Sequence, residues 1–151
     1  MTTAQPTVSA VEGLVRDTLS THKSLFLATA GSAGPWVGGV YFAELGPFTL
    51  TVVLEQRGRT LAAVREQPVV SVVVSTGSPM HPFLQAQADV EIVEGEEGEG
   101  LRGALVSKVP EVAPFLDAPI VTARLRVRTW RATDIPNGWL PGVDLPSPRS
   151  A

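Results

Sequence analysis

Three closely spaced apolar segments in the first half of the chain constrain its fold most strongly. Ser24–Ala30, Trp36–Ala43 and Phe48–Leu54 are separated only by short segments, each of which contains a Gly-Pro pair typical of turns. Strands joined by connections this short pair as antiparallel hairpins, because a parallel pair needs a long crossover. The stretch 25–68 therefore predicts the start of an antiparallel sheet.

Two later segments extend the predicted sheet. Phe83–Val93 alternates between apolar and polar residues, which places Gln85 and Gln87 on the face opposite Leu84. We expect this polar face to lie in solvent, or else to line a polar site or a subunit contact. Val69–Ser75 is instead a continuous run of mostly β-branched residues, which is typical of a strand buried on both faces.

The last predicted strand, Ile120–Thr133, carries an unusual row of arginines. Its alternation places Arg124, Arg126 and Arg128 on one face together with Trp130. We expect a solvated outer face on which the arginine stems cover apolar surface. An anion-facing stripe and pairing with the acidic segment 94–99 are the alternatives.

Helices are expected in front of the strands and between them. Ser9 and Glu12 fit a capping box, in which a hydroxyl and a carboxylate each satisfy a backbone N–H at the helix start. Apolar residues follow at helical spacing, so the first helix is predicted over 9–21. Three shorter helices are predicted after residue 60, around 97–107 and near 110–116.

The chain is long enough for one domain with a sizeable core. We place this domain at 9–133 and expect a mainly β fold, a six-stranded antiparallel barrel with an N-terminal helix and short connecting helices. Residues 1–8 are expected to form a flexible arm. Residues 134–151 are rich in Pro and Gly and lack periodicity, which predicts an irregular tail.

Composition excludes several classes of site and partner. The 151-residue chain has no cysteine, which excludes disulfides, zinc–thiolate centres, iron–sulfur clusters and cysteine nucleophiles. It has two histidines, His22 and His81, and no carboxylate cluster, so no metal site is predicted. The net charge of −3 argues against nucleic-acid binding. No apolar run is long enough to span a membrane and the first residues lack the features of a signal peptide, so we expect a cytoplasmic protein.

The segment 55–60 carries the strongest candidate for a binding site. It contains Arg57, Gly58 and Arg59, and it opens a predicted short helix directly after a strand. Backbone N–H groups at a helix N-terminus are unpaired and attract anions, and two arginines add permanently charged, forked donors. The segment therefore indicates a phosphate site. The alternative is a polar turn with two solvated arginines.

The order of these parts along the chain carries further information. A leading helix is followed by Leu27-Ala28-Thr29-Ala30, by the turn at Gly34-Pro35, and by a strand that ends in Val40-Tyr41-Phe42. The arginine turn comes next, and Pro68 precedes the valine-rich strand. In this order the chain resembles, over 9–133, the pyridoxamine 5'-phosphate oxidase-like family of FMN-binding split β-barrels, closest to its small, largely uncharacterised bacterial branch. The resemblance implies a Greek-key split barrel and a homodimer with two FMN molecules at the subunit interface.

The resemblance also implies a set of cofactor-binding positions. Family members hold the flavin phosphate with a serine or threonine followed by arginine and lysine, and these positions fall on Gly58, Arg59 and Thr60. Arg59 matches, whereas Gly58 lacks the hydroxyl and Thr60 lacks the charge, for which Arg57 would compensate from one side. Loss of one charged contact lowers the expected FMN affinity by about ten- to a hundredfold. The remaining implied contacts are Gly39, Val40 and Tyr41 along the isoalloxazine ring, Thr51 near the ribityl chain, Gln85 and Gln87 from the partner subunit, and Trp139 covering the site.

The function expected from this resemblance is flavin-dependent redox chemistry. A flavin supplies that chemistry itself, in agreement with a sequence that has no catalytic triad, paired-carboxylate site or nucleotide-binding glycine motif. We expect an FMN-binding oxidoreductase of unknown substrate. It is not expected to be a true pyridoxamine phosphate oxidase, because its C-terminal half lacks the arginine- and histidine-bearing substrate segment of those enzymes. The alternatives are a deazaflavin-dependent reductase, a haem-binding protein with His22 or His81 as axial ligand, and a non-enzymatic dimeric binding or sensor protein with a degenerate flavin site.

Overall fold

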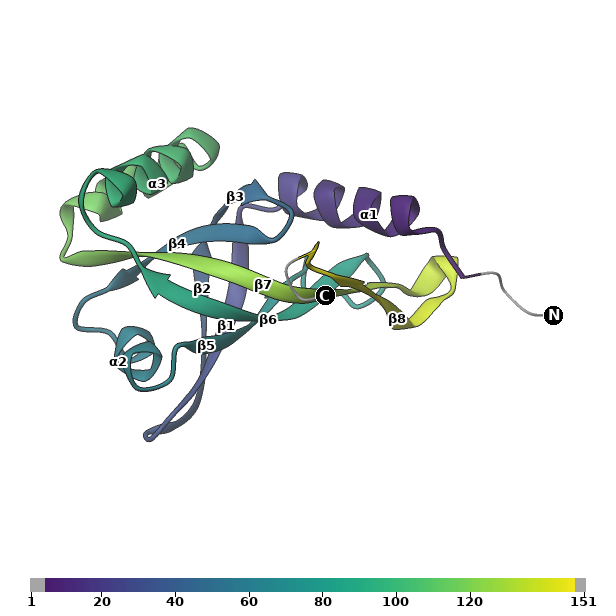
Figure 1. Ribbon diagram of the computed structural model, residues 1–151, viewed down its shortest axis with the longest axis horizontal. Coiled ribbons are helices and arrows are strands. Elements are labelled where there is room, and N and C mark those ends of the chain that lie inside the picture. The colour runs from purple at the N-terminus through teal and green to yellow at the C-terminus, as the bar shows by residue number, and fades with distance from the viewer. Residues whose placement is uncertain (1–4, 149–151) are drawn as a thin grey trace.

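The structure is a computed structural model that describes residues 5–148. Within this range the chain forms an eight-stranded antiparallel sheet that curls into a half-barrel (Figure 1). The strands are β1 (Ser24–Gly31), β2 (Gly34–Tyr41), β3 (Ala43–Gly46), β4 (Thr49–Glu55), β5 (Val69–Val74), β6 (Phe83–Ile92), β7 (Ile120–Asp134) and β8 (Trp139–Pro146). They lie in the order β2-β1-β5-β6-β7-β4-β3, and β8 pairs with the C-terminal part of β7.

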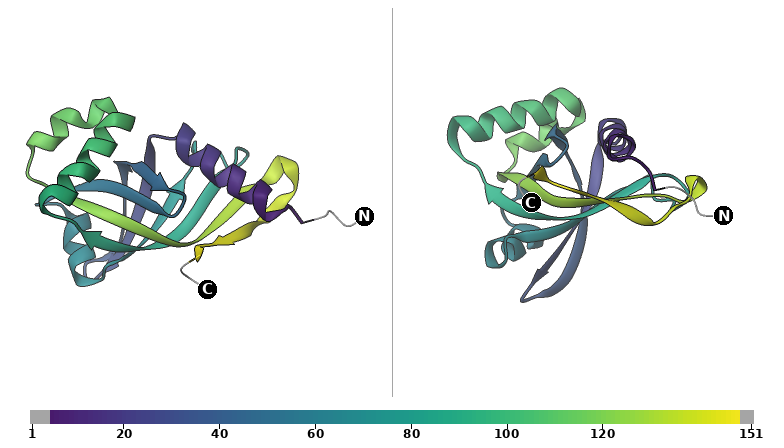
Figure 2. Two further views of the ribbon diagram at one scale, coloured as in Figure 1. Left: turned by 45° about the horizontal axis from the view of Figure 1, so that its top comes forward. Right: turned by 45° about the vertical axis from the view of Figure 1, so that its right-hand side comes forward.

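Helical segments cover and connect these strands. They are α1 (Val8–Thr21), α2 (Arg59–Glu66), α3 (Gly95–Lys108) and the two 3-10 helices η1 (Pro110–Asp117) and η2 (Ile135–Asn137). Figures 1 and 2 show α1 and α3 along one side of the sheet, and α2 beside the β1–β2 hairpin. None of the helices between residues 5 and 148 has the length and apolar character needed to cross a membrane.

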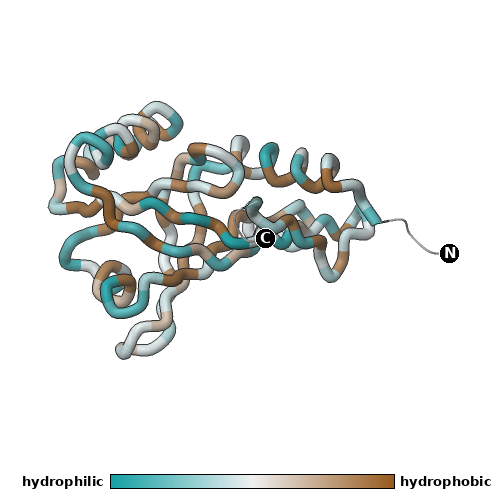
Figure 3. The backbone as a smooth tube through the Cα atoms, in the orientation of Figure 1, coloured by the Kyte–Doolittle hydropathy of each residue, from teal (hydrophilic) through white to brown (hydrophobic). Residues whose placement is uncertain are grey.

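The main core lies between α1 and the inner face of the sheet. On α1 the buried residues Val11, Val15 and Leu19 recur every four positions, so one face of the helix is apolar. On β1 alternate residues are buried, including Leu25 and Leu27, as the two-residue repeat of a strand requires. Figure 3 shows the same division, with hydrophobic and hydrophilic residues alternating along the strands. Burial of one face fixes the register of the sheet, because a one-residue slip would expose the whole core face.

The six predicted strands are all present, and the structure adds two more. Ala43, expected at the end of the second strand, instead begins β3, a four-residue strand that pairs with β4. The prediction of an irregular tail over 134–151 is wrong, because Trp139–Pro146 forms β8 beside β7. Proline is tolerated in such an edge strand, whose outer N–H groups need no strand partner. Residues 149–151 lie outside the described range.

The first helix begins before its predicted cap. The N-cap of α1 is Thr7, whose hydroxyl oxygen accepts a hydrogen bond from the Ala10 backbone N–H at 3.1 Å. Ser9 is already inside the helix, so the capping box of Ser9 and Glu12 is wrong. Serine and threonine are both strong N-cap residues, so Thr7 and Ser9 were both candidates for the N-cap. Of the predicted arm, residues 1–4 lie outside the described range.

The arginine face of β7 is interrupted by a bulge. The β6–β7 register shifts between Gln87 and Ala88, which leaves Arg128 as an extra residue on β7. Beyond the bulge, Trp130 points inward, is fully buried, and donates its Nε1–H to the Pro47 carbonyl at 2.5 Å. The prediction that Trp130 shares a face with the arginines is therefore wrong.

The arginines of β7 are held by acidic residues of β6 and α3. Arg124 contacts both Glu91 and Glu97, and Arg128 donates hydrogen bonds of 2.7 and 3.2 Å to Asp89. The hydrogen bond from Arg128 is the main cause that lowers the pKa of Asp89. Pairing with the acidic segment 94–99, one of the predicted alternatives, is thus present through Glu97. The row is an ion-paired outer face.

Candidate functional site

A cleft opens where the two ends of the curled sheet approach each other. β2 and β4 are not hydrogen-bonded neighbours, yet both line this cleft, and η1 forms a third wall. Its volume is about 500 Å³, which falls within the range of small-molecule sites. The lining residues include Gly39, Val40 and Tyr41 from β2, Val53 and Glu55 from β4, and Val112 and Phe115 from η1. The three predicted residues of β2 therefore lie together at one cavity.

The cleft is largely apolar and has a charged pair at its rim. Among the described residues that line it, Glu55 alone carries a charge, and its Oε1 accepts a 2.5 Å hydrogen bond from Arg57 Nε. This hydrogen bond lowers the pKa of Glu55. The Arg57 side chain is 77 % exposed, so the pair is in contact with solvent. Arg57, predicted to bind phosphate, is thus close to the cleft, but its Nε already donates to the Glu55 carboxylate.

Arg59 and Thr60 begin α2 next to β2. The Nη2 of Arg59 donates to the Ala33 carbonyl at 2.8 Å, and its guanidinium lies 4.4 Å from the centroid of the Trp36 ring. Thr60 Oγ1 lies 4.0 Å from the position that a Cβ on Gly38 would occupy. The N-cap residue of α2 makes no side-chain hydrogen bond to the helix, so no side chain caps the first backbone N–H groups. The start of α2 therefore lies beside the first part of β2, and Glu55, which lines the cleft and bonds to Arg57, links the arginine turn to the cleft.

The paired glycines of β2 allow close contacts without a bulge. The β1–β2 register is continuous from Ser24–Tyr41 to Gly31–Gly34, so Gly38 and Gly39 do not form a bulge. A Cβ on Gly39 would lie 3.9 Å from the Phe26 ring, an ordinary contact distance. Because Gly39 also lines the cleft, its missing side chain leaves the edge of β2 open to a flat ligand.

The η1 wall of the cleft is anchored by a lysine at the end of α3. Lys108 Nζ donates to Glu44 Oε1 at 2.6 Å and to the Leu19 carbonyl at 2.7 Å, and it lies 3.8 Å from the centroid of the Phe42 ring. Burial lowers the pKa of Lys108, and Glu44 partly offsets this effect. Since Pro110 begins η1 two residues later, the anchor ties this wall to α1 and β3.

The outer face of the sheet continues from the cleft across four strands. Gly39, Phe26, Val73 and Gln85 are successive cross-strand neighbours on β2, β1, β5 and β6. The part of this face on β1 and β2 is apolar and open, since Phe26 is 51 % exposed and Val37 is 61 % exposed. The face therefore links the cleft to the glutamines of β6.

The strand β5 is buried on one face, whereas its sequence predicted burial on both. Val70, Val72 and Val74 point into the core, but Ser71 is exposed and Val73 is half-buried on the outer face. The valine-rich pattern is thus only half explained by contacts within one chain. Its outer half belongs to the open apolar surface next to the cleft.

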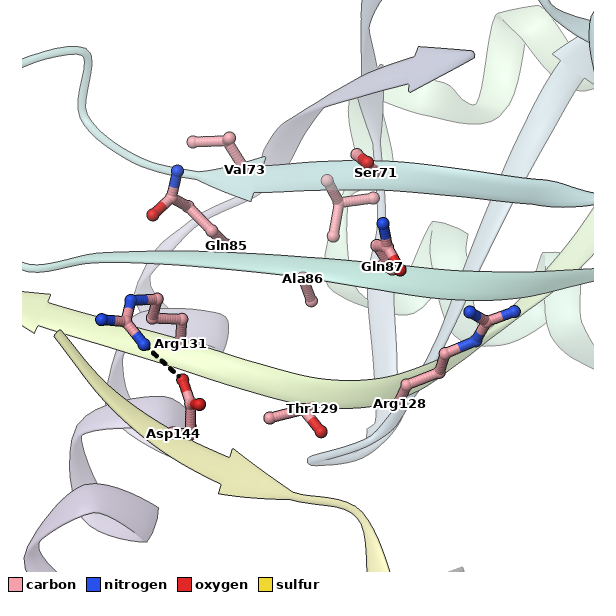
Figure 4. A pocket seen from close by; sticks show the side chains of 10 residues that line it. Ser71, Val73, Gln85, Ala86, Gln87, Arg128, Thr129, Arg131 and Asp144 are labelled. Carbon is pink, nitrogen blue, oxygen red and sulfur yellow. Dashed lines mark hydrogen bonds and ion pairs between the residues drawn. The ribbon is translucent and has the colours of Figure 1, made fainter. Parts of the chain in front are cut away.

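Gln85 and Gln87 line a separate, shallow polar pocket on the outer face of the sheet (Figure 4). This pocket has a volume of about 610 Å³ and includes Arg128 and Arg131 of β7. Asp144 of β8 accepts a 2.8 Å hydrogen bond from Arg131, drawn as a dashed line in Figure 4. Within one chain, the structure does not bring the predicted glutamines and the predicted β2 residues into one cavity.

Two other predicted contacts lie away from both cavities. Thr51 is fully buried in β4 and its hydroxyl donates to the Ala123 carbonyl at 3.1 Å, so it does not reach the cleft. Trp139 begins β8 and packs against the main core, and it lines neither the cleft nor the polar pocket. Both side chains have structural partners instead.

Sequence reasoning missed Glu55 and the η1 residues Val112 and Phe115. Opposite charges two residues apart, as in Glu55 and Arg57, were the available signal for the rim pair. Phe115 offered no comparable signal, because an exposed aromatic residue and a core aromatic residue look alike in a sequence.

The two histidines line one small cavity beside the C-terminal half of α1. His22 and His81 both line it, and its volume of about 190 Å³ is below the range of ligand pockets. His22 Nδ1 donates to the Thr18 carbonyl at 2.7 Å, and its Nε2 is buried without a hydrogen-bond partner. His81 Nδ1 lies 2.8 Å from Thr76 Oγ1. Within residues 5–148, no group of three His, Asp or Glu side chains is placed to hold a metal ion.

Comparison with known proteins identifies the fold. Neither protein-family models nor curated proteins give a match to the chain. Solved structures do match it, among them a haem-binding protein from Mycobacterium smegmatis, with a TM-score of 0.77, 18 % identity, and coverage of 95 % of this chain and 60 % of that one. A candidate pyridoxamine 5'-phosphate oxidase from Listeria innocua matches with a TM-score of 0.67, 20 % identity, and coverage of 82 % and 98 %. An FAD-binding protein from Mesorhizobium loti matches with a TM-score of 0.62, 19 % identity, and coverage of 78 % and 90 %.

These similarities confirm the predicted split β-barrel fold. The identities are low, so they establish the fold alone. The chain spans about 60 % of the length of the Mycobacterium smegmatis protein. Proteins with this fold bind a flavin in one case and haem in another, which leaves the ligand of this chain to be argued from its own residues.

Proposed function

We propose that the protein is a flavin-binding homodimer that holds FMN in the cleft between β2 and β4 and uses it for redox chemistry on a small substrate. The observation that carries this proposal is the juxtaposition of a largely apolar cleft of about 500 Å³ with a helix start that bears Arg57 and Arg59. FMN has two parts that match these two features. Its ring system is flat and mostly apolar, like the cleft, and its phosphate is anionic, opposite in charge to the arginines. The bound flavin would supply the electron or hydride transfer.

The ring would lie along the edge of β2. Gly39 presents no side chain there, and Val53 and Phe115 supply apolar walls. β2 is the end strand of the sheet order within the described residues, so backbone groups on its free edge are available to the polar atoms of the ring. Tyr41 lines the same cleft and is 36 % exposed, so its side chain is accessible to a ligand.

The phosphate would lie at the start of α2. The first backbone N–H groups of this helix have no side-chain cap and carry partial positive charge. Arg59 and Arg57 would add charge, and Thr60 would offer a hydroxyl where lysine is missing. An FMN phosphate carries close to two negative charges near neutral pH, so these groups complement it.

A second copy of the chain would complete the site. The outer face beside the cleft exposes Phe26 and Val37, and the outer side of β5 is valine-rich although it is open in one chain. Apolar surface of this kind is typical of a subunit interface. In a two-fold dimer the same face is used by both copies, so Gln85 and Gln87 of one subunit would approach the cleft of the other.

An FMN titration followed by flavin fluorescence tests the proposal. We expect quenching by the wild-type protein and at least about a tenfold loss of affinity in the double variant R57A/R59A, because the charged donors to the phosphate are removed. The double variant R16A/R65A is the matched control, since it removes two exposed arginines outside the turn. Absence of quenching by the wild-type protein at tens of micromolar FMN, or equal affinities of R57A/R59A and the control, would refute the proposal.

Haem binding is the second candidate. It is favoured by one observation, the buried Nε2 of His22 that lacks a partner in a cavity shared with His81. The volume of about 190 Å³ makes this cavity smaller than the β2–β4 cleft, so we favour the flavin. A Soret band on addition of haem, retained in R57A/R59A and lost in H22A or H81A, would favour haem instead.

A further inference from the structure

We propose that Glu55 competes with the flavin phosphate for Arg57 and thereby lowers the preference of the cleft for FMN over riboflavin. The inference rests on the proposed function, because it concerns which flavin the cleft selects. Glu55 is thereby a specificity-determining residue, and its partner Arg57 is the group for which the carboxylate and the phosphate compete.

The contact between Glu55 and Arg57 is the first step of the argument. Their 2.5 Å hydrogen bond uses the guanidinium, whose fork binds carboxylates and phosphates in the same manner. Glu55 also lines the cleft, and it is the residue that joins the cleft to the arginine turn. This bond uses only Nε, so a phosphate that binds the Nη groups of Arg57 would share the guanidinium with Glu55 and lie close to its negative charge.

The two arginines of the turn differ in whether they already contact a charged group. Arg59 contacts the Ala33 carbonyl and the Trp36 ring, neither of which carries a charge. Arg59 can therefore receive a phosphate with no carboxylate bonded to the same guanidinium. A phosphate on Arg57 would instead share the guanidinium with the ionised Glu55. Discrimination between phosphorylated and unphosphorylated flavins consequently depends on the Glu55–Arg57 pair.

Gly58 packs closely on the backbone of Glu55 in the same turn. A Cβ at residue 58 would lie 3.2 Å from the Glu55 carbonyl oxygen and 3.5 Å from its Cβ. The Gly58 backbone N–H also donates to that carbonyl at 3.0 Å, which closes the turn onto residue 55. The missing side chain at 58 and the competing carboxylate at 55 are therefore parts of one local arrangement.

Parallel titrations with FMN and riboflavin test the inference. We expect wild-type protein to bind the two flavins with affinities within about tenfold of each other. Substitution Glu55→Gln should tighten FMN binding at least about fivefold and leave riboflavin binding unchanged, because it removes the carboxylate charge and keeps the shape. Glu99→Gln is the matched control, since it removes the same charge from an exposed position on α3. Adding R57A to E55Q should abolish the gain.

The outcomes separate this inference from the proposed function. If wild-type protein binds flavin and E55Q leaves the FMN-to-riboflavin ratio unchanged, the competitor role is overturned and the flavin site stands. If E55Q raises the affinities for both flavins equally, the effect is not on the phosphate, and the role is likewise overturned. If neither protein binds either flavin, the proposed function fails and the inference fails with it.

Discussion

Replacement of Lys108 by methionine should destabilise the fold through the wall of the cleft. Lys108 Nζ bonds to Glu44 and to the Leu19 carbonyl, and the side chains of Lys108 and Glu44 are only 18 % and 23 % exposed. Methionine keeps most of the apolar stem but removes the charge. It leaves a carboxylate and a carbonyl without their donor in a half-buried setting.

The magnitude follows from these two contacts. A hydrogen bond that involves a charged group contributes about 1.5–3 kcal/mol, so two of them set an upper bound of about 6 kcal/mol. Removing a lysine whose pKa burial has lowered recovers part of this, because the ammonium no longer has to be desolvated. We therefore expect a net loss of about 2 kcal/mol, which corresponds to a fall in Tm of about 4–8 °C for a chain of this size.

Urea denaturation of matched variants tests this reasoning. Lys23→Met is the control, since Lys23 pairs with Glu111 at 3.3 Å on the exposed surface and should change the free energy of unfolding little. The double variant E44Q/K108M should recover about 1 kcal/mol relative to K108M, because it removes the stranded charge. A K108M protein as stable as the K23M control, or a double variant less stable than K108M, would refute the account of the anchor.

Two further predictions concern the sheet. Trp130→Phe should lower the free energy of unfolding, measured by urea denaturation, by about 2–3 kcal/mol, because it leaves a cavity and removes the donor to the Pro47 carbonyl. Trp36→Phe on the surface should lower it much less, and equal effects of the two substitutions would contradict the buried placement of Trp130. The pKa of Asp89 is lowered by Arg128, so this carboxylate stabilises the fold above its ordinary value of 3.8 and loses that effect as the pH falls through its folded value. The stability difference between wild-type protein and D89N should be below about 1 kcal/mol near neutral pH and should vanish in acid, and a difference that grows in acid would be inconsistent with the pair.

The sequence predicted those parts of the fold that follow from regular alternation. Phe83–Val93 has one apolar and one polar side, and the structure buries Leu84 and exposes Gln85 accordingly. Trp130 was placed on the wrong face because the bulge at Arg128 depends on the pairing of two strands, which a single strand pattern does not encode. β8 was missed for a related reason. Its prolines hide the strand pattern, and only the free edge of β7 makes them acceptable.

The candidate site was predictable only where it is contiguous in sequence. Gly39–Tyr41 and the turn at 57–60 were singled out as segments, and the structure brings both to β2. Thr51 was misplaced because its hydroxyl finds a buried partner on β7, a contact that depends on strand order. Glu55 and the η1 wall were missed because their role depends on the curl of the sheet, which brings the two ends of the strand order together.

The central claim, that the flavin ring occupies the cleft between β2 and β4, is tested most directly by filling this cleft. Ala118 lines it at the end of η1, and Ala113 lies exposed on the same helix without lining it, so Ala118→Trp and Ala113→Trp add the same bulk inside and outside the cavity. In fluorescence titrations with FMN and riboflavin, we expect A118W to lose at least about tenfold in affinity for both flavins and A113W to match the wild-type protein, with equal unfolding midpoints for the two variants. Flavin affinities of A118W equal to those of A113W would contradict the account.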